Sequence, residues 1–365
     1  MKKSLLALAV LGAFAGAASA QSSVTLYGTM DLGLVRQTGA DWRLDSGNGI
    51  SQLGFRGVED LGGGMAGIFD LRTRLSPESG GLDGSNNKRP FWQAISAVGL
   101  QGGFGKVLLG RMLTALGGPV NNTDPWATEQ QGVPFLPSGY CAEPAACLNQ
   151  DNAGLGRADV ITYSTPSLGG FGVAVSVGPK RSNDTGTGIT HPNALFSLWA
   201  SYAAGPLYIG GGTEKNRDGD KIAAILGSYD FGVVKVMGGV GQVDNLSNHA
   251  SLVPASVSVS SAGVVTGVAQ GTDTLLAGKK GQNMNFGLVA PFGPFVAKFG
   301  YGRSKAETAT TAAFQRETNK VAVGADYILS KRTKLYTSYG QQRVKTSATV
   351  RTTAKGLDFG IQHNF

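Results

Sequence analysis

The sequence is short of charge and has no long apolar run. Charged residues make up 15% of the 365 residues, whereas a typical soluble domain has about a quarter. A membrane-spanning helix needs about 20 consecutive apolar residues, and the mean hydropathy here is only −0.02. The nearest candidate, residues 281–297, is uncharged but is interrupted by Pro291 and Pro294. These absences exclude a protein that crosses a membrane with helices.

Histidine and cysteine are also scarce. None of the three histidines, His191, His249 and His363, can be paired by sequence with a nucleophilic serine and an orienting acid. We therefore expect no catalytic residues and no enzyme activity. The two cysteines, Cys141 and Cys147, have no flanking metal ligands, so we expect no metal and no cofactor. In an oxidising compartment this pair predicts a local disulfide.

The first twenty residues have the three parts of an export signal. Two lysines follow Met1, a small apolar stretch comes next, and residues 18–20 read Ala-Ser-Ala. We expect residues 1–20 to be a removed signal peptide and residues 21–365 to form one domain; the alternative is a soluble N-terminal helix.

The chain is basic, with a sequence pI near 9.4. Export and the lack of a Lys/Arg cluster argue against a nucleic-acid partner.

Glycine and alternating apolar residues are what the chain has in abundance. Glycine accounts for 56 residues, about twice its usual share. Residues 171–177 alternate between large apolar and small side chains, and residues 356–365 alternate between mainly apolar residues and Gly or polar residues, which is the period-two pattern of a strand. Seven short turns rich in Gly and Pro alternate with eight longer polar segments, and these fifteen connections predict sixteen strands. The pattern predicts an all-β, sixteen-stranded antiparallel transmembrane barrel. A soluble β-sandwich or β-helix is the alternative, but it leaves the asymmetry between turns and loops unexplained.

Several blocks of sequence resemble a known family. The blocks are residues 23–28, residues 54–64 with Phe-Arg-Gly-Val-Glu-Asp-Leu-Gly-Gly-Gly, residues 98–111, and the final Phe365. They are similar to the general diffusion porins of Gram-negative outer membranes, of the betaproteobacterial type. The resemblance implies a water-filled channel for passive diffusion of ions and small hydrophilic solutes, and a homotrimer in the outer-membrane lipid bilayer with lipopolysaccharide. It also implies that Phe365 is a signal for the outer-membrane assembly machinery.

The resemblance further implies a pore constriction between a basic wall and an in-folded third loop. We expect the basic wall to contain Arg56, Arg72 and Arg74, because their strand parity places them inward, together with Arg157. A second family arginine falls on Trp92, so this chain departs from the pattern there. The third loop, residues 113–156, would present Asp124 and Glu129, and it carries an Asp-Pro-Trp sequence similar to the family's motif. Further lumenal cations are expected at Lys235, Lys298 and Lys320.

A basic constriction predicts mild anion selectivity. Two alternatives stay open from the sequence. The third loop could lie on the surface, and the barrel could be a non-conducting receptor or adhesin that recognises its partner through residues 113–156 and 244–280.

Overall fold

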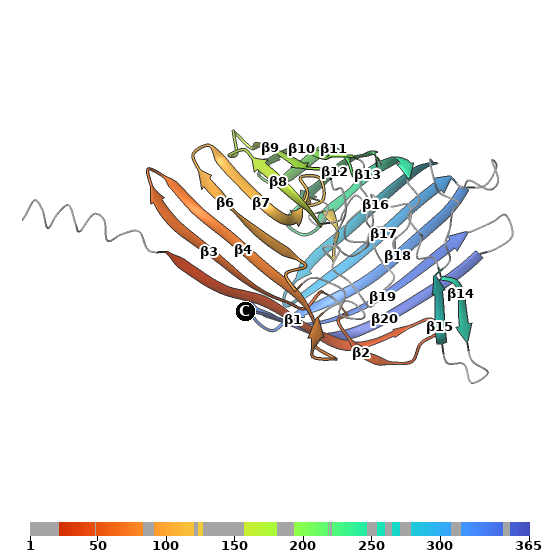
Figure 1. The fold of residues 1–365 in the computed structure, drawn as a ribbon. Helices are drawn as coiled ribbons and strands as arrows, with labels where there is room; N and C mark the ends of the chain where they lie inside the picture. The colour runs from red at the N-terminus through yellow and green to blue at the C-terminus, as the bar shows by residue number, and fades with distance from the viewer. Residues whose placement is uncertain are drawn as a thin grey trace, which may run out of the picture.

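Sixteen long strands form one closed antiparallel barrel in the part of the chain that the structure describes (Figure 1). The computed structural model describes residues 22–47, 49–82, 91–119, 123–126, 157–180, 193–217, 219, 221–246, 254–259, 265–270, 279–307, 315–345 and 351–365. None of these residues belongs to a helix that is long and apolar enough to cross a membrane. The prediction of sixteen antiparallel wall strands is confirmed.

The wall strands follow one another around the ring in chain order. They are β1 (Ser23–Gln37), β3 (Gln52–Gly62), β4 (Met65–Ser76), β6 (Ile95–Gly102), β7 (Gly105–Leu113), β8 (Arg157–Ser164), β9 (Phe171–Gly178), β10 (Leu195–Ala204), β11 (Leu207–Lys215), β12 (Lys221–Asp230), β13 (Lys235–Leu246), β16 (Lys279–Phe292), β17 (Phe295–Glu307), β18 (Gln315–Ile328), β19 (Thr333–Lys345) and β20 (Arg351–Asn364). Two short strands, β2 (Arg43–Asp45) and β5 (Gly81–Leu82), pair beside β1 and β4. A separate hairpin joins β14 (Pro254–Val259) to β15 (Val265–Gln270).

Side chains alternate between the two faces of the wall, as strand geometry requires. In β12 the side chains of Ile222 and Leu226 are buried on the inner side, whereas Ile225 is 59% exposed on the outer side. The register carries this alternation across strands, because Ile225 lies opposite Val240 of β13, and Val240 is 57% exposed. An apolar outer face of this extent is suited to lipid, as in outer-membrane barrels.

Short turns gather at one end of the barrel and longer connections at the other (Figure 1). Gly205 and Gly293 occupy two of the short turns with φ of +53° and +58°, a region that residues with a Cβ rarely adopt. The end with the short turns also holds Ser23 and Phe365. In outer-membrane barrels short turns face the periplasm and long loops face outward. We name the two ends of this barrel the turn end and the loop end.

The ring closes at β1. Residues 23–29 of this strand pair with β3, and residues 29–37 pair with β20. Gly28 and Phe365 exchange two backbone hydrogen bonds of 3.1 Å. A Cβ at position 28 would stand 2.6 Å from the Phe365 ring and would also collide with the backbone of Gln52, so the seam requires glycine there.

Candidate functional site: the barrel interior

Three arginines line the inner face of β3 and β4. Arg56 lies opposite Thr25 of β1 and Asp70 of β4, on the face that alternates with the exposed apolar residues of β1. Arg72 and Arg74 share that face of β4 with Asp70. The structure therefore brings together the three arginines that strand parity predicted, and we call Arg56, Arg72 and Arg74 the basic ladder.

An aromatic ring orients the first arginine of the basic ladder. The guanidinium carbon of Arg56 lies 5.1 Å from the ring centroid of Tyr27, a distance typical of a cation–π contact. The Tyr27 hydroxyl donates a hydrogen bond to the Asp70 carboxylate. Arg56 is nevertheless exposed, so its charge is held in place while it stays accessible to water.

The third loop begins as a segment that packs against the inner wall. Its Thr114 hydroxyl donates a 2.6 Å hydrogen bond to the Glu214 carboxylate of β11. The next two backbone N–H groups donate to serine hydroxyls of β9 and β10, from Ala115 to Ser176 at 2.9 Å and from Leu116 to Ser197 at 3.0 Å. Leu116 is fully buried in a cluster with Trp199 and Ile222.

A second part of the third loop contacts a different arc of the inner wall. The Asn285 amide of β16 donates to the Thr123 carbonyl at 3.1 Å. The Trp126 indole N–H donates to the Ser338 hydroxyl of β19 at 3.2 Å, and Trp126 is only 3% exposed. Asp124 caps this turn by accepting the Trp126 backbone N–H at 3.0 Å. The Asp-Pro-Trp sequence therefore fixes residues 123–126 to β16 through β19.

Glycine permits this docking. A Cβ at Gly287 of β16 would stand 2.6 Å from the ring of Pro125, and one at Gly324 of β18 would stand 3.1 Å from the Trp126 indole. Because glycine has no side chain at these two positions, Pro125 and Trp126 can approach the wall closely.

The lysines predicted in the lumen have different surroundings. Lys298 is 8% exposed at its side chain and forms a 2.9 Å ion pair with Asp326, which also pairs with Lys334 at 2.9 Å. Lys320 is 5% exposed and shares the inner face of β18 with Asp326. Lys235 begins β13 opposite Asp230, near the turn end. All three predicted lysines thus have inward parity, but Lys298 is buried and shares the Asp326 carboxylate with Lys334.

Arg157 does not share the inner face on which the sequence analysis expected it. It begins β8 opposite Leu113 of β7, and it shares a face with Ile161 and Tyr163, which are 46% and 39% exposed on the outside. The register therefore separates Arg157 from the basic ladder. The sequence did not reveal this because a residue that follows a long loop has no reliable parity until its first strand pairing is known.

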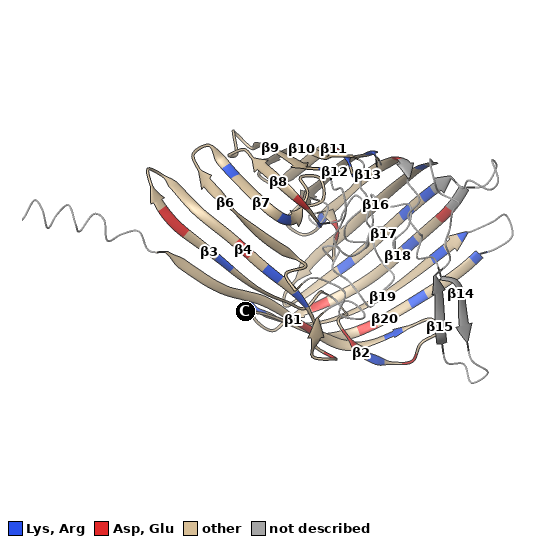
Figure 2. Ribbon diagram, viewed as in Figure 1, with Lys and Arg blue, Asp and Glu red and all other residues tan. Residues whose placement is uncertain are grey.

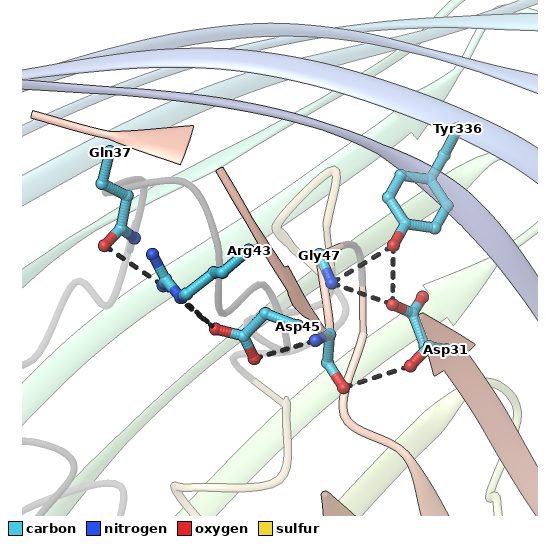
Figure 3. Close-up of polar contacts among 7 residues, drawn as sticks. Asp31, Gln37, Arg43, Asp45, Gly47 and Tyr336 are labelled. Atoms are coloured by element: carbon cyan, nitrogen blue, oxygen red, sulfur yellow. Dashed lines mark hydrogen bonds and ion pairs between the residues drawn. The ribbon is translucent and has the colours of Figure 1, made fainter. Parts of the chain in front are cut away.

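The structure adds an inward bulge that the sequence analysis missed. Residues 46, 47 and 49–51, between β2 and β3, lie against the inner face of β1, and Figure 3 shows Gly47 beside Asp31. Gly47 N–H donates to the Asp31 carboxylate at 2.9 Å, and Tyr336 of β19 donates to the same carboxylate at 2.8 Å. Asp31 is fully buried. Residues 38–50 are one of the eight longer polar segments, which predicted an outer loop there, and the inward parity of Asp31 and Tyr336 was the available signal against it.

Further predicted residues lie outside the described part of the chain. They are the signal peptide 1–20, Glu129 on the third loop, and the cysteines Cys141 and Cys147 of the predicted disulfide. Within the described residues, no three His, Cys, Asp or Glu side chains are grouped as metal ligands.

Five inward carboxylates are more buried than the basic ladder, whereas a sixth, Asp70, is partly buried like Arg72 and Arg74. Asp31, Asp358, Glu214 and Asp326 are at most 5% exposed, and Asp124 is 6% exposed. The basic ladder keeps contact with the lumen, because Arg56 is exposed and Arg72 and Arg74 are only partly buried. The water inside this barrel therefore meets guanidinium groups more directly than these five carboxylates.

A closed sixteen-stranded barrel with an apolar outside and a polar, charged inside defines the class of outer-membrane channel proteins. The chain belongs to the Gram-negative porin family, whose family model matches residues 7–347.

Curated relatives cover nearly the whole chain. Outer membrane porin protein 32 of Delftia acidovorans is 30% identical over 378 residues, which cover 99% of this chain and 95% of the relative. An outer membrane porin protein of Bordetella pertussis is 28% identical over the full length of both chains. Major outer membrane protein P.IB of Neisseria gonorrhoeae is 28% identical over 93% of each.

Solved structures share the fold. The anion-selective porin from Comamonas acidovorans superimposes with a TM-score of 0.73 at 23% identity, covering 94% of this chain and 100% of that one. A trimer form of OmpT from Vibrio cholerae superimposes with a TM-score of 0.64 at 13% identity, covering 94% and 99%. Together with the relatives, the barrel identifies this protein as an outer-membrane porin, a water-filled channel for ions and small hydrophilic solutes.

Proposed function

We propose that this porin passes anions in preference to cations, through a constriction bounded by the basic ladder and the third loop. The observation that carries the proposal is that Arg56 is exposed and Arg72 and Arg74 are partly buried, whereas five of the inward carboxylates are at most 6% exposed and only Asp70 among the ladder's neighbours is partly buried. Permeant ions interact most directly with the charged side chains that line the water of the path. A solved neighbour of the same fold is described as an anion-selective porin, which supports the same reading.

The third loop supplies the other boundary in this proposal. Residues 114–116 contact β9 to β11, and residues 123–126 contact β16 to β19. A chain that follows both arcs leaves the inner face of β3 and β4, with the basic ladder, as the opposite border of the open path. Anions would then cross close to Arg56, Arg72 and Arg74, with Asp124 and Glu129 on the loop side.

Reversal of charge on the basic ladder tests the proposal. We expect Arg56→Glu, Arg72→Glu and Arg74→Glu together to shift the zero-current potential in a KCl gradient towards cation preference, in planar bilayers with purified protein. The Lys331→Glu and Arg332→Glu pair in the exposed β18–β19 turn is a control, because these residues lie at the turn end. If the triple variant kept the selectivity of the unmodified protein, the basic ladder would not line the path.

We also propose that the channel is a homotrimer that associates with lipopolysaccharide and is assembled with Phe365 as its recognition signal. A trimer form is described for one solved neighbour, and Phe365 packs beside Gly28 at the turn end. Electrophoresis without heating and native mass spectrometry would measure the subunit number. A monomer in both measurements would contradict the trimer.

A further inference from the structure

Tyr27 crosses the inner face of β3 to reach β4. In the strand register Tyr27 lies opposite Gly54, and Gly54 lies opposite Arg72. A Cβ at position 54 would stand 2.5 Å from Cζ of the Tyr27 ring and 2.9 Å from its hydroxyl oxygen. Glycine therefore leaves the space in which the ring lies against the wall, and the hydroxyl reaches the Asp70 carboxylate of β4.

Asp70 lies among the cations of the basic ladder. It is directly opposite Arg56 on β3 and two residues from Arg72 on the same face of β4, whereas its neighbour on β6 is Ala97. Figure 2 shows Lys or Arg positions on both β3 and β4. Opposite charges in directly opposed positions attract each other. Nevertheless, neither Arg56 nor Arg72 forms an ion pair in the part of the chain that the structure describes.

The two ends of the Tyr27 side chain contact the two opposite charges. Its hydroxyl donates to the Asp70 carboxylate, and the centroid of its ring lies 5.1 Å from the guanidinium carbon of Arg56. The carboxylate thus has a neutral donor, and the guanidinium has the face of a neutral ring. Neither contact offsets the charge of Arg56, whose side chain is exposed on the lumenal face.

We propose that Tyr27 is a specificity-determining residue of the channel, because its hydroxyl holds Asp70 away from Arg56. The inference rests on the anion preference proposed above. Without the hydroxyl, the Asp70 carboxylate would take a guanidinium as its donor, since hydrogen bonds between arginine and carboxylate are among the strong ones. The net charge of the basic ladder would stay the same, but a carboxylate in contact with Arg56 would offset the attraction of that guanidinium for a passing anion.

Removal of the hydroxyl alone tests this role. Tyr27→Phe keeps the ring beside Arg56, and we expect it to lower the chloride-to-potassium permeability ratio by about twofold. The ratio is measured from the zero-current potential in a KCl gradient across planar bilayers that contain the purified porin. Tyr301→Phe is the matched control, because the Tyr301 hydroxyl donates to Asn319 at 3.1 Å on the outer face, opposite Val321, which is 38% exposed. The control should keep the ratio of the unmodified porin.

A change at Asp70 supplies the second arm of the experiment. We expect Asp70→Asn to raise the permeability ratio by about twofold, because it removes the negative charge beside Arg56. In that background Tyr27→Phe should have no further effect, since the group that loses its donor carries no charge. Lower stability alone would not produce this pattern, because the permeability ratio responds to the charges along the path. An equal shift from Tyr27→Phe in both backgrounds would overturn the role of the hydroxyl, and so would an unchanged ratio in Asp70→Asn.

Failure of this inference can be distinguished from failure of the proposed function. If charge reversal of the basic ladder changed the selectivity but Tyr27→Phe did not, only the role of Tyr27 would be overturned. If neither variant changed the selectivity, the basic ladder would not line the path, and the role of Tyr27 would be overturned together with the proposed function. Electrophoretic mobility without heating, compared with the unmodified porin, verifies that the barrel of each variant is folded.

Discussion

Individual side chains hold the inner wall together at places where a polar group is fully buried. Tyr336 reaches from β19 across Gly360 of β20 and Gly33 of β1 to the Asp31 carboxylate (Figure 3). The two glycines provide the space in which the Tyr336 ring lies, because a Cβ at either position would collide with the Tyr336 hydroxyl. One phenol thus links three neighbouring strands and the inward bulge.

Loss of that hydroxyl should destabilise the barrel. Tyr336→Phe removes the 2.8 Å hydrogen bond to Asp31 and the 3.2 Å hydrogen bond from Gly47 N–H, and it leaves a buried carboxylate short of a donor, which costs about 1–3 kcal/mol. The measurement is the urea midpoint of unfolding. Tyr339→Phe is the matched control, because Tyr339 is on the outer face of the same strand and 40% exposed; equal shifts in both variants would refute the role of Tyr336.

Strand parity shows what could be predicted for single residues. Arg56, Arg72 and Arg74 stand in regular strands with alternating neighbours, so their inward direction could be read from the sequence. Arg157 could not be placed in the same way, because it follows a long loop and its register depends on pairing with Leu113. The hydrogen-bond partners of buried carboxylates could not be predicted from the sequence either, because residues such as Asp31 and Tyr336 are 305 positions apart in the chain.

Among the elements, the third loop has two anchors of different character. Its start is held by hydroxyl groups of β9 and β10 and by Glu214, and residues 123–126 are held by an indole seated over Gly324. The sequence identified the length of this loop and its Asp-Pro-Trp motif. The wall contacts could not be predicted, because they require the inner surfaces of six strands that are distant in sequence, namely β9, β10, β11, β16, β18 and β19.

Removal of the indole should release the second anchor. Trp126→Ala should lower stability by about 3–5 kcal/mol as a buried aromatic truncation, and it should raise single-channel conductance, because residues 123–126 lose their attachment to β18 and β19. Trp42→Ala is the control: Trp42 is 42% exposed and contacts Phe359 on the outside, so conductance should stay the same. An unchanged conductance in Trp126→Ala would show that this segment does not narrow the path.

The segment between β13 and β16 also differs from its sequence prediction. Residues 244–280 were read as one long loop, yet they contain the hairpin of β14 and β15. Alternating valines in residues 255–259 were the available signal. The high content of Ser, Ala and Gly obscured it, since these residues are typical of loops.

The molecule as a whole depends on the seam between β1 and its two partners. We expect Gly28→Ala to reduce the yield of folded, heat-modifiable barrel in detergent and to destabilise it by about 1–3 kcal/mol, as overpacking does. The added methyl group would meet the Phe365 ring and the Gln52 backbone. Gly211→Ala is the matched control, because the nearest atoms there are 3.4 and 3.5 Å away; an equal loss in both variants would contradict the explanation.

The same seam determines the order of events during folding. Thr29 donates a 2.8 Å hydrogen bond to Asn364, which is 335 residues further along the chain. Contacts between residues so distant form slowly, and until they form, β1 and β20 each present an unpaired edge that can join another chain. We therefore expect closure to come after the other strand pairings, and we expect mispairing with another chain mainly in the interval before that step.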